Sequence, residues 1–243
     1  MYDPTETELS LNLLKEMSRE CDKKNIRIAI IGGWATFFYV DNTYSKAFGK
    51  NYMGSRDIDI SFDHSKEDEF HKLIKDLGFT PNGMYFRWER IYNRESKKYI
   101  SQKDAEKEEI FNLIHIFLDL FCDRQTNALK SWHLEPLKHI TYFNMNGFSL
   151  ANIDTLIALK CIALFSRDKS DKENKDACDL YALIAYSQQK IKHSKLLKKA
   201  IEKIIYRSDL LYVIAQHVLL DPARQSIVQY ALTAKLREFE DEN

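Results

Sequence analysis

All seven glycines of this 243-residue chain lie in its first 147 residues, and none follows Gly147. Seven glycines and four prolines are also far below the share of roughly 12% that these residues have in an average protein. Glycine and proline mark turns, so their scarcity favours long helices over a many-turned β-sandwich or barrel. We expect two domains, a mixed α/β domain at 1–150 and an all-helical domain at 151–243.

The periodicity of apolar residues supports this division. Strands are expected where apolar residues alternate or β-branched residues cluster, and the dipeptide Asn146-Gly147 predicts a hairpin between 140–144 and 148–150. The other expected strands are 26–31, 57–62, 84–91, 98–101 and 110–121. Helices are expected at 6–24, 34–40, 65–77, 152–165, 174–188, 194–206, 209–219 and 223–239.

The charges of the chain cancel, with 36 Lys and Arg residues against 36 Asp and Glu residues. This balance excludes a protein that coats nucleic acid along its whole surface. A local excess remains, because residues 160–203 hold eleven basic and six acidic side chains. Such a segment would suit an RNA acceptor such as tRNA, and a solvated helix face explains it equally well.

Three features of the sequence bear on the cellular compartment of the protein and on whether it enters a membrane. The runs without a charged residue, such as 28–40, are all shorter than the ~18 residues that a membrane span needs. The acidic N-terminus does not resemble a secretion signal. The four cysteines are scattered, with no C-x-x-C pair, which is typical of reduced core thiols. We therefore expect a cytoplasmic protein that does not enter a membrane.

The first candidate site feature is Gly32-Gly33, between a predicted strand and a predicted helix. Two glycines let the backbone approach an anion closely, and the following helix offers free N–H groups and the positive end of its dipole. A phosphate group would bind well here, and a plain tight turn is the alternative. The motifs G-x-G-x-x-G and G-K-[ST] are both absent, which excludes the dinucleotide fingerprint and the P-loop.

The second feature is Asp57-Ile58-Asp59 on a predicted strand. Residues i and i+2 of a strand point to the same face, so both carboxylates should converge. Two like charges repel unless a divalent cation lies between them. The alternative is a solvent-facing strand edge.

The third feature is Asp119, which is surrounded by large apolar residues in segment 114–121. A buried carboxylate without a partner costs several kcal/mol. We therefore expect a metal ion beside Asp119, an open strand end, or a salt bridge to a nearby Arg or Lys.

Taken together, these features resemble the DNA-polymerase-β-like nucleotidyltransferase superfamily, and within it the AbiEii-type nucleotidyltransferases, the toxins of type IV toxin–antitoxin pairs. Many members of the superfamily have serine where this chain has Gly33, and relatives often have arginine where it has Met53. The segments that match are 30–35, 55–60 and 117–121, followed by a block of Lys160, Arg167 and 175–180 that resembles K…R…K-D-x-x-D.

The resemblance implies a mixed β-sheet with flanking helices, followed by a C-terminal helical bundle. It implies a Mg²⁺-dependent (or Mn²⁺-dependent) enzyme that transfers a nucleoside monophosphate from an NTP to an acceptor hydroxyl and releases pyrophosphate. The acceptor would be RNA, such as tRNA, or a protein, and a toxin would have a cognate antitoxin as its partner. The alternative is a module of the same fold that binds a nucleotide or a protein without catalysis.

The resemblance also assigns roles to residues. It implies that Asp57, Asp59 and Asp119 are the metal ligands and catalytic groups. It implies that the nucleotide is held by Gly32, Gly33, Trp34, Ser55, Lys160 and Asp176. The helical stripe of the segment 156–163 leaves Lys160 at its margin, where we expect an accessible phosphate ligand, or a lysine that pairs with Asp176 or Asp179.

Overall fold

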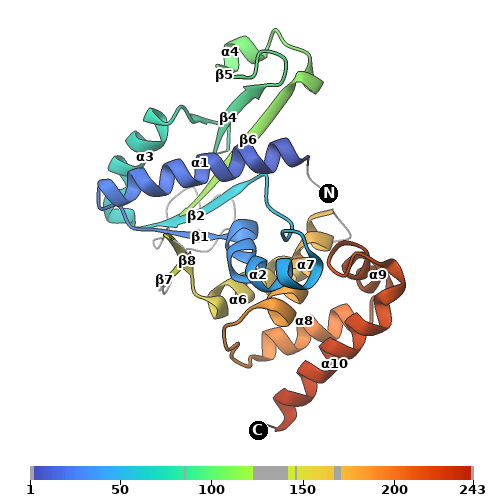
Figure 1. Cartoon of the computed structure of the whole chain (residues 1–243). Helices are drawn as coiled ribbons and strands as arrows, with labels where there is room; N and C mark the ends of the chain where they lie inside the picture. The colour runs from blue at the N-terminus through green and yellow to red at the C-terminus, as the bar shows by residue number, and fades with distance from the viewer. Residues whose placement is uncertain (1–2, 85, 123–141, 146, 167–170, 242–243) are drawn as a thin grey trace. The chain divides into compact units, whose positions relative to one another are not determined.

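The computed structural model consists of two compact units, and Figure 1 labels their helices and strands. The first unit contains residues 1–34 and 53–151, and the second contains 35–52 and 152–243. No helix in the part of the chain that the structure describes has the length and hydrophobicity needed to cross a membrane. The described residues are 3–84, 86–122, 142–145, 147–166 and 171–241.

The first unit is built on a mixed sheet, in which the described residues form eight strands. The strand order is β3-β4-β6-β2-β1-β8-β7, and β5 pairs with β4. Strand β6 is parallel to β2 and antiparallel to β4, while β1 is antiparallel to β2 and parallel to β8. The bounds are β1 Ile28–Ile31, β2 Ile58–Phe62, β3 Thr80–Pro81, β4 Arg87–Asn93, β5 Lys98–Ile100, β6 Leu113–Cys122, β7 Tyr142–Met145 and β8 Phe148–Ala151.

Two predicted features of the sheet are confirmed. Strand β6 follows the expected alternation, because Ile114, Ile116 and Leu118 are buried while Phe117 on the other face is partly exposed. The hairpin at Asn146-Gly147 joins β7 and β8, with Met145 opposite Phe148. Asn146 itself lies outside the described residues, as do the first two residues of the strand expected at 140–144.

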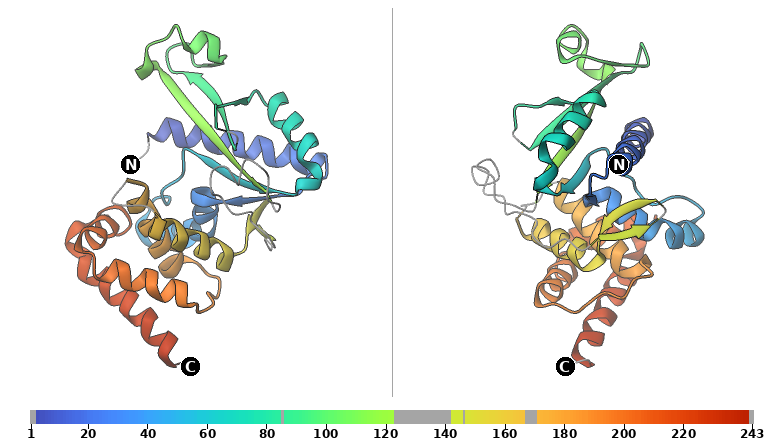
Figure 2. Two further views of the ribbon diagram at one scale, coloured as in Figure 1. Left: turned by 180° about the vertical axis from the view of Figure 1, so that it is seen from behind. Right: turned by 90° about the vertical axis from the view of Figure 1, so that its left-hand side faces the viewer.

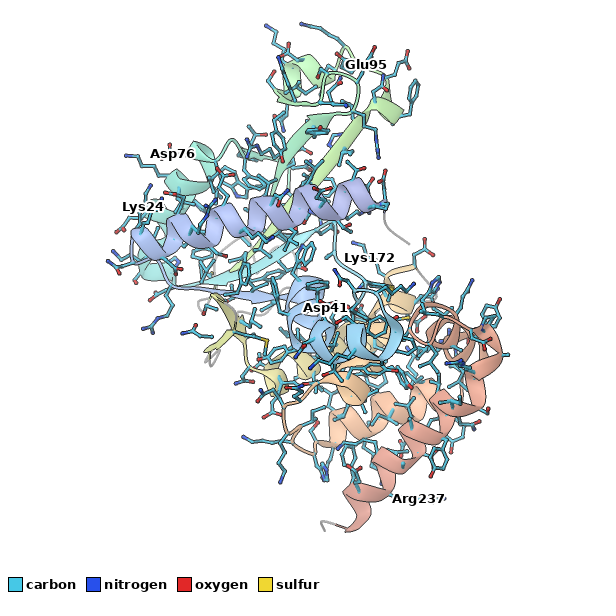
Figure 3. The ribbon with its side chains drawn as sticks, in the orientation of Figure 1. Lys24, Asp41, Asp76, Glu95, Lys172 and Arg237 are labelled. Atoms are coloured by element: carbon cyan, nitrogen blue, oxygen red, sulfur yellow. The ribbon has the colours of Figure 1, made fainter. Side chains whose placement is uncertain are left out.

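Two helices pack against each other beside this sheet. Helix α1 (Pro4–Lys23) contacts β6 and α3 (Glu67–Asp76), and it crosses the sheet in Figure 1. Their exposed ends approach each other, with 3.9 Å between Lys24 Nζ and Asp76 Oδ2 (Figure 3). Strands β4 and β6 extend beyond the helices, and β5 and α4 (Gln102–Ala105) lie at the far end of this ribbon (Figure 2). The short 3₁₀ turns of this unit are His64–Lys66 and Ile110–Asn112.

Helix α2 (Gly32–Phe48) follows β1, and it includes the segment 34–40 that we expected to form the first turns of a helix. From Ala35 onward it belongs to the second unit. Its last turns pack within that unit, because Tyr44 lies edge-on against Tyr186 at 5.4 Å and its hydroxyl donates to the carbonyl of Val218. The carboxylate of Asp41, on the same helix, accepts a hydrogen bond from the backbone N–H of Tyr52.

The second unit is otherwise a bundle of C-terminal helices. Helix α7 packs on α6 and α9, and α8 packs on α6 and α10. Side chains such as Leu180, Leu197 and Ile214 are fully buried between them. Arg167, which belongs to the matching block, lies outside the described residues, as do 168–170. The bounds are α6 Ile153–Ser166, α7 Asp171–Tyr186, α8 Lys195–Ile205, α9 Ser208–His217 and α10 Gln225–Asp241, with a 3₁₀ turn at Pro222–Arg224.

Candidate active site

Gly32 lies where strand β1 ends and helix α2 begins, and it has a φ of +66°. A Cβ atom at this position would overlap with Oδ2 of Asp59 and lie 2.7 Å from its Cγ. The left-handed backbone and the close carboxylate both require glycine here. The glycine turn therefore lies directly against the second aspartate of the D-x-D motif.

The register of the sheet aligns the predicted acidic residues. In the parallel pair of β2 and β6, Asp59 is directly opposite Asp119. Neighbouring strands lie about 4.8 Å apart, so the two side chains leave the same face of the sheet side by side. Asp57 lies just before β2, two residues ahead of Asp59. The structure thus sets two of the three carboxylates that the sequence singled out, those of Asp59 and Asp119, side by side.

Arg87 is a fourth member of this cluster, and the sequence analysis did not identify it. It lies on β4 directly opposite Asp119. Its Nε donates to Oδ1 of Asp119 and its Nη2 donates to Oδ2, both at 2.6 Å. The salt bridge considered for Asp119 is therefore present, in the bidentate form that is the strongest for a guanidinium and a carboxylate.

The electrostatics of Arg87 show that all three carboxylates act on it. Hydrogen bonding to Asp119 raises the pKa of the guanidinium above its usual value, and the charges of Asp57 and Asp59 raise it further, against the effect of burial. The guanidinium also lies 4.8 Å from the ring centre of Phe117. Arg56, at the exposed rim, approaches Asp57 only to 3.6 Å.

The other predicted nucleotide-binding residues of the first unit are largely covered. The Trp34 side chain is 2% exposed and its Nε1 donates to Oγ of Ser10 at 2.9 Å. Gly33 and Ser55 are buried. The indole of Trp34 therefore anchors the start of α2 to α1, and the phosphate contacts of Gly33, Trp34 and Ser55 stay predictions.

Lys160 and Asp176 form a second ionic cluster, within the helical unit. The expectation that Lys160 lies at an accessible margin is wrong, because it is only 7% exposed. Its ammonium donates to Asp176 at 2.9 Å and lies 2.6 Å from Oδ2 of Asp179. Burial alone would lower the pKa of Lys160, but the two carboxylates outweigh it and raise the pKa. The pairing that the sequence offered as the alternative is the one observed.

Two further side chains complete this second cluster. Asp179 is fully buried and accepts hydrogen bonds from Lys175 and, at 3.0 Å, from the hydroxyl of Tyr52. Burial would raise the pKa of Asp179, but Lys160 and Lys175 together lower it below its usual value. Two ammonium groups thus neutralise two carboxylates. Nucleotide binding by Lys160 and Asp176 stays a prediction.

The donor chemistry of the first cluster fits a hard divalent cation, since Mg²⁺ prefers carboxylate oxygens. Within the described ranges, however, no group of three or more His, Cys, Asp or Glu side chains is arranged to hold a metal ion. Arg87 engages both oxygens of Asp119 in this structure. The metal-binding roles of Asp57, Asp59 and Asp119 stay predictions.

The fold is that of nucleotidyltransferase-like proteins, as expected. A Helicobacter pylori protein whose own assignment as a nucleotidyltransferase is provisional aligns with a TM-score of 0.51 and 14% identity, over 100% of this chain and 99% of that one. JHP933 from Helicobacter pylori aligns with a TM-score of 0.50 and 14% identity, over 97% and 95% of the two chains. An antigenic nucleotidyltransferase-like protein from Paracoccidioides brasiliensis is 19% identical, with a TM-score of 0.48 over 88% and 93%.

No family model matches the chain, and no curated protein is similar to it in sequence. At identities this low, the structural similarity establishes the shared fold and leaves the chemistry to be argued from the residues.

Proposed function

We propose that the chain is a nucleotidyltransferase that transfers a nucleoside monophosphate from an NTP to an acceptor hydroxyl with the help of Mg²⁺ or Mn²⁺. The observation that carries the proposal is the register of β2 and β6, which sets Asp59 beside Asp119, with Gly32 against Asp59. The sheet holds these groups at fixed spacing, and phosphoryl transfer depends mainly on such positioning and on electrostatic stabilisation.

Each acidic residue has a role in this proposal. Asp57 and Asp59 would hold the divalent cation, and Asp119 would complete the donor set and accept the proton of the acceptor hydroxyl, while pyrophosphate leaves. The bound cation would neutralise charge on the transferring phosphoryl group. Gly32 lets the backbone of the β1–α2 turn approach the phosphates, which would lie at the N-terminal end of α2.

The acceptor is proposed to be RNA, because exposed lysines collect on α8 and the segment before it. Lys190, Lys192, Lys195 and Lys199 are exposed. Lys203 does not belong to this set, because it pairs with the buried carboxylate of Glu173 at 2.8 Å. A toxin of a type IV toxin–antitoxin pair, with an antitoxin protein as its partner, and a protein acceptor are the further forms of this proposal that follow from the resemblance.

One observation favours a second candidate, a nucleotide-binding or protein-binding module without catalysis. Arg87 holds both oxygens of Asp119, and a permanent ion pair at this position would keep a third metal ligand out of reach. The two candidates differ in turnover and not in fold.

The test is incubation of the protein with each labelled NTP, Mg²⁺, and either total RNA or a protein extract. We expect label to enter one acceptor fraction. Asp59→Asn should reduce transfer more than about a hundredfold, since even outer-shell partners of metal ligands cost about ten- to a hundredfold. Because Asp59→Asn removes one of several crowded like charges, its unfolding free energy without metal should be unchanged or slightly raised.

Asp68→Asn is the matched control, because Asp68 is an exposed residue on α3 of the same unit. It should transfer label at the wild-type rate. Binding of nucleotide without labelling of any fraction would establish the second candidate. A large loss of stability in Asp59→Asn without metal would show that Asp59 has a structural role, and the proposed site would then be wrong.

A further inference from the structure

The proposed reaction leaves a buried carboxylate of the sheet unit without a role. Glu89 on β4 is only 5% exposed, and it accepts hydrogen bonds from the side-chain amides of Asn82 and Gln102. A third partner is His115 on β6, whose Nδ1 lies 3.1 Å from Oε2 of Glu89. Burial would raise the pKa of Glu89, but these hydrogen bonds outweigh it and lower the pKa. The carboxylate is therefore ionised at neutral pH and can only accept, so Nδ1 of His115 carries a proton and donates it.

This hydrogen bond decides what the rest of the His115 ring can do. In a neutral imidazole one nitrogen donates and the other accepts, so Nε2 is a hydrogen-bond acceptor here. The His115 side chain is 40% exposed, whereas its glutamate partner is buried. A buried carboxylate thus orients an accessible imidazole, in the way that supporting hydrogen bonds hold a ligand-binding group in place.

His115 belongs to a row of flat side chains that leads to Asp119. Residues 115, 117 and 119 alternate with fully buried residues of β6, so they share one face of the strand. The rings of His115 and Phe117 are nearly parallel, with an interplanar angle of 22° and 6.1 Å between their centres. The guanidinium of Arg87 lies 4.8 Å from the ring centre of Phe117. We call His115, Phe117 and Arg87 the stacking row.

The stacking row lies on the side of Asp119 away from the proposed phosphate site. Strand β1 and the turn proposed to hold the phosphates border one edge of β2, and β6 borders the other. The first residue of β2 is opposite Leu118, so among the described strands only β4 pairs with residues 113–117 of β6 (Figure 1). Along β6, Phe117 lies about 6.6 Å and His115 about 13 Å from Asp119. An acceptor whose hydroxyl reaches Asp119 thus has this row beside it.

We propose that the stacking row binds the terminal nucleotide of a single-stranded RNA acceptor, with the base on Phe117 and its exocyclic amino group donating to Nε2 of His115. Bases at RNA ends stack on aromatic rings and guanidinium planes and are read along their hydrogen-bonding edges. One sugar ring separates a base from its 3′-hydroxyl, which suits the step from Asp119 to Phe117. The position of that hydroxyl rests on the proposed function, whereas binding of the base does not.

The orientation of His115 also selects the base. Adenine and cytosine present an amino group where guanine and uracil present a carbonyl oxygen. An acceptor nitrogen pairs with the amino group and repels the carbonyl oxygen. The site therefore prefers RNA that ends in A or C.

The test measures binding by fluorescence anisotropy to the whole protein, without NTP, of 5′-labelled single-stranded RNAs that differ only in their last nucleotide. RNA ending in A or C should bind about two- to tenfold tighter than RNA ending in G or U, as expected for one hydrogen bond. His115→Asn removes Nε2 but can still donate from its amide to Glu89, so it should fold and lose this preference. The matched control is His64→Asn, because His64 of the same unit also pairs with a glutamate, Glu67, at 2.9 Å. It should keep the preference.

Phe117→Leu tests the stacking contact. It keeps an apolar side chain on β6 but removes the ring, so all four RNAs should bind at least about fivefold more weakly. Phe111→Leu is the matched control, because Phe111 is 74% exposed in the 3₁₀ turn before β6 and lies outside the stacking row. It should bind the four RNAs like wild type.

Equal affinity for the four RNAs in wild type, or a preference that survives in His115→Asn, would overturn the base contact. Wild-type affinity in Phe117→Leu would overturn the stacking contact. Because binding is measured without NTP, failure of the proposed function is seen separately. Binding with the expected preference but without labelling of any fraction would sustain the RNA site and refute the enzyme. Labelling of a protein extract together with no RNA binding would sustain the enzyme and overturn this inference.

Discussion

The two ionic clusters of this chain use the same residue types in opposite ways. In the helical unit, Lys160 and Lys175 balance Asp176 and Asp179, and Tyr52 adds a further donor. In the sheet unit, Arg87 makes hydrogen bonds to Asp119, and the charges of Asp57 and Asp59 also act on it. The first cluster pairs two ammonium groups with two carboxylates, whereas the second gathers three carboxylates of one sheet around guanidinium groups.

In the proposed function, this difference separates a structural role from a chemical one. A buried, balanced cluster loses stability when any partner is removed, because an uncompensated charge stays behind. A cluster with surplus negative charge gains stability when a cation binds and loses little when one carboxylate is neutralised. The two clusters should therefore respond in opposite directions to substitution and to metal ions.

The largest expected effect is that of Lys160→Ala. It leaves Asp176 and fully buried Asp179 without their main counter-ion, so the free energy of unfolding should fall by about 3–5 kcal/mol. Urea denaturation measures this loss. Lys190→Ala, at an exposed position of the same unit, should stay within about 0.5 kcal/mol of wild type. A loss below about 1 kcal/mol for Lys160→Ala would contradict the buried ion pairs and would favour the accessible position that the sequence suggested.

A smaller effect is expected from Gly32→Ala, which disturbs the sheet cluster. The reference is Gly49→Ala, because Gly49 has a φ of +68° with open space around its Cα. Backbone strain should cost about 1–2 kcal/mol in both variants. In Gly32→Ala the new Cβ also meets Asp59, which should add about 1–3 kcal/mol. Equal losses in the two variants would mean that Gly32 does not lie against that carboxylate.

The smallest expected effect is a change in how the free energy of unfolding depends on pH when Asp179 is replaced by Asn. The folded state lowers the pKa of Asp179, so this carboxylate contributes stability that is present above its unfolded pKa of about 3.9 and is lost as the pH falls through the lower, folded value. The stability difference between wild type and Asp179→Asn should therefore narrow between pH 6 and pH 3. A difference that is constant over this range would contradict the lowered pKa.

Sequence reasoning located the acidic residues of the sheet cluster because their signal is local. Alternation along a strand places Asp57 and Asp59 on one face, and a carboxylate among apolar neighbours identifies Asp119. The sequence did not identify Arg87, because its position opposite Asp119 depends on the antiparallel register of β4 and β6, which cannot be inferred from a local pattern. The sequence offered only a weak sign of its role, a charged residue next to Trp88 on an expected strand, and Trp88 is buried in the structure.

The helical unit shows the same limit. The periodicity of α6 placed Lys160 near a boundary of the apolar stripe, but burial of the lysine depends on α7, which supplies both carboxylates. The periodicity of 34–40 predicted only the first turns of α2, and its last turns up to Phe48 pack against Tyr186. In both cases a tertiary partner decides the outcome.

The parallel pairing of β2 with β6 also has a consequence for how the protein is made. About fifty residues separate the two strands, and that segment includes β4. Pairing of distant segments is slow, because the entropy of closing the loop must be overcome before the contacts form. A growing chain on the ribosome therefore cannot assemble the acidic cluster until β6 has emerged, so this cluster forms late, after most of the sheet has been synthesised.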